Sequence, residues 1–336
     1  MLLFTQLVKK TRKEVMKMTT EIITVEAREV QSKKFMQAGL VDKFVRFAGV
    51  CDKSASTYRI ALKQMFKYFV VNGITTPTRE DLGNWRDSLI AAKKSPSTVQ
   101  LYLCSCKLFF RWTAQEGIFA NIADHLKSKV KVSHEHKKDA LTTSQAGTLI
   151  KGVKGSTIKA KRDRAILALM VSTGVRCIEI CRADVADMIE QFGRTYLLIQ
   201  GKGHSSKDAK ILLPAQVEGL IRDYLKERGN VDATQPLFTS TANRNRGQRL
   251  STQTISKMVK SQLRSAGFDT PRLTAHSLRH CALTAMLLAG CELTQVQQVA
   301  RHVNINTTMI YNHTIERMKN TAEQIAANAI FDTISA

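Results

Sequence analysis

The sequence predicts a two-domain, mainly α-helical protein with one small β-hairpin or sheet. Its length of 336 residues suits two domains of roughly 150 residues each, and 43% hydrophobic content is ordinary for a globular chain. Apolar residues recur at three- and four-residue spacing over most of the chain after residue 38. One pair of short β-prone runs, Tyr196 to Ile199 and Ile211 to Leu213, interrupts this helical pattern.

The N-terminal half predicts an extension followed by a four-helix domain. Residues 1–38 lack sustained periodicity and are assigned to the extension, and residues 39–126 to the domain. A weak helical pattern covers 41–48. Three stronger helices are predicted from Tyr58 to Val70 with Gly73 as the terminating glycine, from about Thr78, and from the N-cap Ser95 with Pro96 at the first position to a stop at Gly117.

A basic linker is predicted between this domain and a second one. Residues 127–139 are polar, rich in lysine and histidine, and without helical period, as expected of an exposed linker. The second domain is assigned to residues 140–336. It begins with helical patterning, and Gly174 ends an apolar helix that runs from Arg164 to Thr173.

The charge of the chain predicts a polyanionic partner. The chain carries 51 Lys and Arg residues against 28 Asp and Glu, a formal charge of +23, and both halves are basic. Folded, evenly basic proteins commonly bind nucleic acid in a salt-dependent way. Double-stranded DNA is the expected partner, and the outward basic residues of the N-terminal helices are either DNA contacts or a solvated face: Lys53, Arg59, Lys63, Lys67, Lys93, Lys94 and Lys107.

Cysteine usage and hydropathy exclude other classes. The seven cysteines lack the spacing of a disulfide framework and suit reduced core thiols better than zinc ligands, so no metal and no other cofactor is expected. No apolar run approaches the ~18 residues of a membrane span. The N-terminus also lacks the charge order of a signal peptide. The expected location is cytoplasmic, with no membrane partner.

Polar residues near predicted helix ends and turns could together form a reaction centre. Two of them share the first turn of one helix, where the N-terminal dipole favours an anion such as phosphate. The candidates are Arg176 after a helix stop, Lys202 between two glycines at the hairpin tip, His276 and Arg279 in that first turn, and His302 followed nine residues later by Tyr311.

These residue types suit cleavage of a phosphodiester without a metal. Such cleavage needs a nucleophile, cations around the pentavalent phosphorane and an acid for the leaving oxygen. Tyr311 would attack the phosphate and form a 3′-phosphotyrosyl bond, whose energy allows rejoining without ATP. Arg176 and Arg279 would hold non-bridging oxygens bidentately. The other expected roles are acid for the 5′-oxygen for Lys202, acid/base toward Tyr311 for His276, and hydrogen-bond donor to phosphate for His302.

From about Leu40 to its end, the chain resembles the tyrosine recombinases of the phage integrase family. The matching motifs are a T-G-x-R-x-x-E box at 173–179, the hairpin lysine, an H-x-L-R-H box at 276–280 and the late histidine with its tyrosine. The resemblance implies a C-shaped DNA clamp, in which a core-binding, SAM-like domain precedes the catalytic domain.

Two positions depart from the family pattern. Arg301 stands where the family usually has glycine, and we expect it to crowd the turn that presents His302. Cys281 replaces a common threonine after the H-x-L-R-H box. His280 and His313 are expected to be structural.

An apolar stripe from Ile315 to Ile330 predicts a final helix. The stripe could pack on its own domain, but the family resemblance favours docking into a neighbouring protomer, and hence a homotetramer on two DNA sites. The favoured function is site-specific recombination, as in integration or excision of a mobile element or in dimer resolution. A type IB topoisomerase and a catalytically silent DNA-binding regulator are the alternatives.

Overall fold

The computed structural model describes residues 39–130, 139–201 and 203–334. Contacts between Cα atoms divide the chain into two compact units between Ser133 and His134, inside the segment predicted as a linker. Each unit has its own hydrophobic core. The extension 1–38, residues 131–138 and Lys202 lie outside the described residues.

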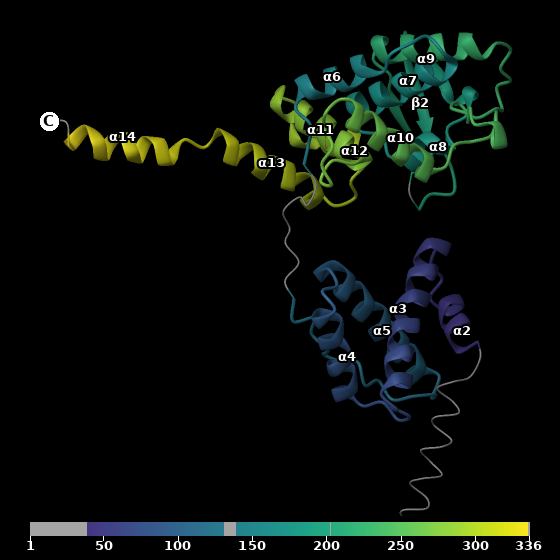
Figure 1. Ribbon diagram of the computed structural model, residues 1–336, viewed down its shortest axis with the longest axis vertical. Coiled ribbons are helices and arrows are strands. Elements are labelled where there is room, and N and C mark those ends of the chain that lie inside the picture. Colours follow the sequence, from purple (N-terminus) through teal and green to yellow (C-terminus); the bar gives the residue numbers. More distant parts are fainter. Residues whose placement is uncertain (1–38, 131–138, 202, 335–336) are drawn as a thin grey trace, which may run out of the picture. The chain divides into compact units, whose positions relative to one another are not determined.

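The first unit contains the helices that the sequence predicted in residues 39–126 (Figure 1). The cap residues act as expected: the Thr78 hydroxyl accepts the Asp81 backbone N–H, Ser95 accepts that of Thr98, and Gly73 has a φ of +65° just beyond its helix. The helices are α2 (Leu40–Phe47), α3 (Asp52–Val71), α4 (Arg79–Ala91) and α5 (Pro96–Gln115).

Aromatic side chains form the centre of this unit. The Phe109 ring is fully buried and meets Phe44, Phe66 and Phe110 edge-on, with centroids 5.4 to 5.7 Å apart. Such edge-to-face pairs stabilise a core beyond the area that they bury. These ring contacts hold together the helices that carry the outward basic residues. Of these, Lys107 is half-buried and Arg59 is paired with Asp42 at 2.9 Å.

The second unit is mostly helical around a small sheet (Figure 1). Its helices before and around the sheet are α6 (Thr143–Gly152), α7 (Ile158–Thr173), α8 (Cys177–Arg182), the 3-10 turn η1 (Val185–Asp187) and α9 (Ala215–Arg228). The later ones are η2 (Asn243–Asn245), α10 (Thr252–Ser265), α11 (Ala275–Leu288), α12 (Leu293–Ala300), α13 (Asn306–Lys319) and α14 (Ala322–Ile334).

The sheet has three antiparallel strands in the order β1-β2-β3. β2 (Arg194–Ile199) and β3 (Ala209–Leu212) form the predicted hairpin, with Leu197 opposite Ile211. β1 (Met188–Gln191) was not predicted, because four residues with two polar ones at the end give no alternation to detect. It pairs with β2 through a tight turn at Phe192 and Gly193.

Close packing of α7 against α11 brings two parts of the candidate site together. A Cβ added at Gly174, which follows α7 with a φ of +64°, would lie 3.4 Å from Leu283 and 3.7 Å from Arg279. Glycine at this position therefore allows both the turn and the close approach of α11. Arg176, two residues later, consequently starts beside Arg279.

The prediction of a single final helix after Tyr311 is wrong. Tyr311 lies inside α13, which ends before Asn320, and a separate helix, α14, begins at Ala322. The Asn320 side chain accepts the Ala322 backbone N–H at 2.9 Å, so it caps the new helix locally. Tyr311 is thereby held by a helix that packs on α11 and α12. No helix among the described residues is long and apolar enough to cross a membrane.

Candidate active site

Arg279 is the buried centre of the candidate site. Its side chain lies on α11 with only 2% of the residue exposed. The guanidinium donates to the Gly174 carbonyl after α7 and to the Ala300 carbonyl at the end of α12, both at 2.5 Å. Burial, together with the neighbouring charges of Arg176 and Arg301, lowers the pKa of Arg279 to about 10, yet the group stays charged at neutral pH.

Arg176 approaches the same place from the start of α8. Its Nη2 donates to the Ala300 carbonyl at 3.3 Å, so the two predicted cations share one acceptor. A helix C-terminus favours positive charge, which explains why both guanidiniums gather at the end of α12. Glu179 orients Arg176 by accepting its Nη1 at 2.9 Å and its backbone N–H at 2.7 Å.

His302 lies against Arg279, with its Nε2 3.0 Å from the Arg279 Nη2. A guanidinium can only donate, so Nε2 accepts, and the proton lies on Nδ1, 2.9 Å from the Thr308 hydroxyl. Burial lowers the pKa of His302 to about 4, with Arg279 and Arg176 as further causes. His302 is therefore neutral in the free protein.

Tyr311 is 4% exposed and packs in a small cluster with Leu283, Leu287 and Ile315. Burial raises the pKa of Tyr311 to about 12, although Arg279 and Arg176 oppose this rise. The phenol is thus neutral and close to both guanidiniums.

His276 is connected to Tyr311 through His280. His276 is exposed at the start of α11, and its ring meets that of His280 edge-on with centroids 4.6 Å apart. The buried His280 ring lies 5.2 Å from the Tyr311 ring. The structure thus brings five of the six predicted catalytic residues into one region, and places His280 among them.

Lys202 is outside the described residues, but the ends of its loop are fixed. The Gly201 carbonyl accepts from Arg182 at 2.8 Å. On the other side, Lys207 binds both Asp184 and Asp187 at 2.6 Å, next to the sheet. These contacts fix Gly201 and Lys207, the described residues on either side, next to β2 and β3.

Arg301 does not crowd the turn as expected. It adopts a φ of +53°, the left-handed conformation that glycine would supply. Its side chain turns to Glu179, with Nη2 2.8 Å from Oε2, which leaves His302 free to reach Arg279. The motif spacing alone does not show that this side chain turns to Glu179, because the direction of a side chain depends on its neighbours in the fold.

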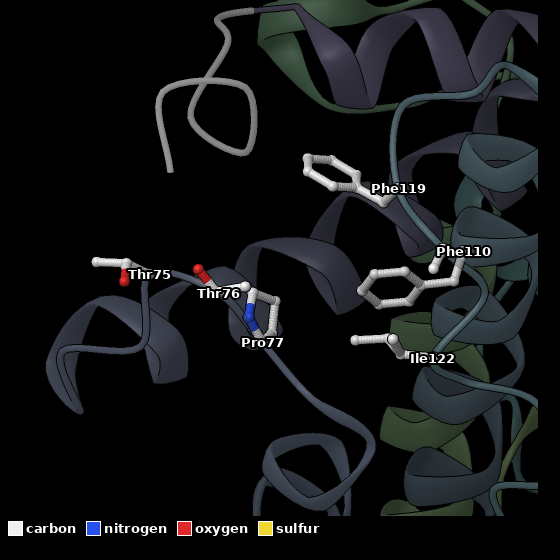
Figure 2. A pocket seen from close by; sticks show the side chains of 7 residues that line it. Thr75, Thr76, Pro77, Phe110, Phe119 and Ile122 are labelled. Atoms are coloured by element: carbon white, nitrogen blue, oxygen red, sulfur yellow. The ribbon is translucent and has the colours of Figure 1, made fainter. Parts of the chain in front are cut away.

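No group of three or more His, Cys, Asp or Glu residues among those described is placed to hold a metal ion. A cavity of about 190 Å³ exists elsewhere, in the first unit, where Phe110, Phe119 and Ile122 face Thr76 and Pro77 (Figure 2). None of the described candidate residues lines it. The described candidate catalytic residues all lie in the second unit.

Comparison with known proteins matches both units to one family. Residues 139–317 match the phage integrase family, and residues 47–117 match the N-terminal SAM-like domain of phage integrases. Tyrosine recombinase XerA of Pyrococcus furiosus is 28% identical over 87% of this chain and 95% of its own. Tyrosine recombinase XerC of Corynebacterium glutamicum is 29% identical over 82% of this chain and 87% of its own.

Solved structures agree in fold. XerH recombinase bound to its palindromic difH substrate has a TM-score of 0.67 at 22% identity, covering 81% of this chain and 80% of that chain. The Tn1549 transposon integrase with circular intermediate DNA has a TM-score of 0.66 at 18% identity, covering 81% and 93%.

The chain belongs to the phage integrase family. It is a tyrosine-type site-specific DNA recombinase with a SAM-like N-terminal domain, as the sequence motifs predicted. The relatives favour this function over the topoisomerase and the silent regulator.

Proposed function

We propose that Tyr311 is the nucleophile that cuts and rejoins DNA through a 3′-phosphotyrosyl bond. The observation that carries this proposal is the convergence of Tyr311 on α13 with Arg176 at the start of α8, Arg279 on α11 and His302 after α12. A charged clamp beside a phenol is what phosphoryl transfer without a metal requires. These four residues, with His276 and Lys202, then have the roles expected from the sequence.

Arg176 and Arg279 hold the scissile phosphate in this proposal. In the free protein their donors point to backbone carbonyls, and a phosphate would compete for those donors as a stronger, charged acceptor. Withdrawal of the Arg279 Nη2 also frees His302 Nε2. The negative phosphate then favours a proton on that nitrogen, so that His302 donates to the phosphate.

The buried phenol requires a conformational step before cleavage. Tyr311 belongs to a cluster of six buried residues apart from the main core of its unit. Such a small cluster can open at low cost compared with the main core. We expect DNA binding to shift α13 and present the Tyr311 oxygen to the phosphate.

The C-terminal helix is proposed to dock into a neighbouring copy on DNA, giving a homotetramer on two sites. Its apolar side chains Ile325, Ile330 and Phe331 are 59 to 66% exposed, and α14 extends beyond the helices of its unit (Figure 1). Large exposed apolar side chains are typical of an interaction surface. A solved lambda integrase of the same fold is a tetramer bound to a Holliday junction.

A nicked suicide substrate tests the nucleophile. After cleavage the short 5′ fragment dissociates, and the protein remains attached to the 3′-phosphate. Wild type is expected to form this covalent complex, whereas Tyr311→Phe should bind the same DNA with similar affinity and form none. Covalent complex from the Phe variant at the wild-type rate would assign the nucleophile to another residue.

A further inference from the structure

Arg301 combines a backbone conformation that disfavours arginine with a buried charge. It ends α12 with a φ of +53°, where glycine is the residue without steric cost. Its side chain is only 15% exposed. The buried Nε–H finds no acceptor among the described residues. Stability alone does not explain an arginine here, since both features oppose folding.

What Arg301 contacts is the carboxylate that orients Arg176. Glu179 is fully buried and binds Arg176 through Oε1 at 2.9 Å and Arg301 through Oε2 at 2.8 Å. Arg301 also donates to the Val299 carbonyl at 2.6 Å, which anchors it to the end of α12. One carboxylate thus joins two guanidiniums that come from distant parts of the chain.

This arrangement changes the charge that a phosphate meets. Without Arg301, the Glu179 carboxylate would neutralise most of the charge of Arg176, its ion-pair partner. With Arg301, the buried cluster contains three guanidiniums, of Arg176, Arg279 and Arg301, and one carboxylate, so it keeps a larger positive potential. A transition state that gains negative charge on phosphate benefits from that potential.

We propose that Arg301 is a positioning residue for DNA cleavage that acts through Glu179. It fixes the Glu179 carboxylate from the side opposite Arg176, and so holds the Arg176 guanidinium where the phosphate binds, while offsetting the carboxylate charge. The inference rests on the proposed function of Tyr311 and the two arginines.

Single-turnover trapping on a suicide half-site separates positioning from binding and from folding. Arg301→Gly is expected to bind the half-site within about threefold of wild type but to form the covalent complex at least about tenfold more slowly at saturating DNA. Arg301→Lys, which keeps the charge, should recover part of that rate. Arg301→Gln keeps a polar side chain without the charge. If the Gly variant melts below the assay temperature, the Gln variant is measured in its place, with the same expected loss of rate.

The matched control is Phe192→Gly. Phe192 also has a positive φ, of +52°, but it is 96% exposed at the β1–β2 turn. Its replacement relieves the same type of backbone strain without touching Glu179. We expect a trapping rate equal to that of wild type.

A double-mutant cycle with Glu179→Gln tests the route of action. If Arg301 acts through Glu179, the double variant should trap no more slowly than Glu179→Gln alone. The inference would be overturned if the rate losses of the two single variants multiplied in the double variant. It would also be overturned if Arg301→Gly and Arg301→Gln both trapped within about threefold of the wild-type rate. Failure of wild type to form any covalent complex would instead refute the proposed function itself.

Discussion

Removal of the Arg279 guanidinium should lower cleavage far more than it lowers stability. Two short hydrogen bonds to buried carbonyls are lost in Arg279→Ala, each worth about 1.5 to 3 kcal/mol because the donor is charged. The opposing effect is the relief of burial. Since burial and the nearby charges of Arg176 and Arg301 lower the Arg279 pKa from 12.5 to about 10, removal of the charge returns about 3 kcal/mol.

The net loss of unfolding free energy is therefore about 0 to 3 kcal/mol, or at most about 10 °C in the Tm of a unit of this size. Loss of one transition-state donor typically costs about 3 kcal/mol, which is roughly 150-fold in rate. The variant should thus remain folded at 25 °C and bind DNA, yet cleave about two orders of magnitude more slowly.

Trapping rates on the suicide substrate, measured well below the Tm from thermal melts, check this prediction. Arg228→Ala is a suitable control, because Arg228 also donates to two backbone carbonyls, those of Pro236 and Leu237, and these lie outside the candidate site. It should lose much less of the cleavage rate. Cleavage by Arg279→Ala within about threefold of wild type would mean that Arg279 is a structural residue rather than part of the phosphate clamp.

Three further predictions concern His302, the C-terminal helix and two lysines of the first unit. The His302 pKa of about 4 lies below its ordinary 6.5, so the unfolded chain binds more protons than the folded protein between these pH values. The free energy of unfolding should therefore fall by about 1 to 2 kcal/mol as pH drops from 6.5 to 4, allowing for the partial exposure of His302. Denaturant melts of wild type and His302→Gln across this pH range measure the fall. Deletion of residues 321–336 should leave the Tm and half-site binding unchanged while cooperative filling of a second half-site is lost, in gel-shift titrations. Replacement of Lys63 and Lys67 by Ala should each reduce the slope of log affinity against log salt by about 0.9 if both bind phosphates.

Different results would contradict each of these. Equal pH dependence in wild type and His302→Gln would show that His302 does not titrate as inferred. A truncated chain that melts earlier and binds half-sites more weakly would indicate that α14 packs on its own unit. Unchanged salt slopes would place Lys63 and Lys67 on a solvated face rather than at the DNA.

Local chemistry allowed the sequence to determine the helices. Thr78 and Ser95 mark helix starts because their hydroxyls accept free N–H groups of the first turn. Pro96 marks a start because its ring takes the place of one of those N–H groups, and Gly73 marks an end because it accepts a positive φ. These signals act within four residues, so spacing alone reveals them. The family motifs were equally visible, since they too are short segments of fixed composition.

Only the tertiary structure decided how those motifs meet. Burial of Tyr311, the neutral state of His302 and the shared acceptor at Ala300 arise from packing of α7, α11, α12 and α13, whose contacts join residues more than 100 positions apart. β1 could not be predicted from the sequence, because its four residues become a strand only against β2. Nor did it show that Arg301 would bind Glu179, because the direction of a side chain depends on which elements lie beside it.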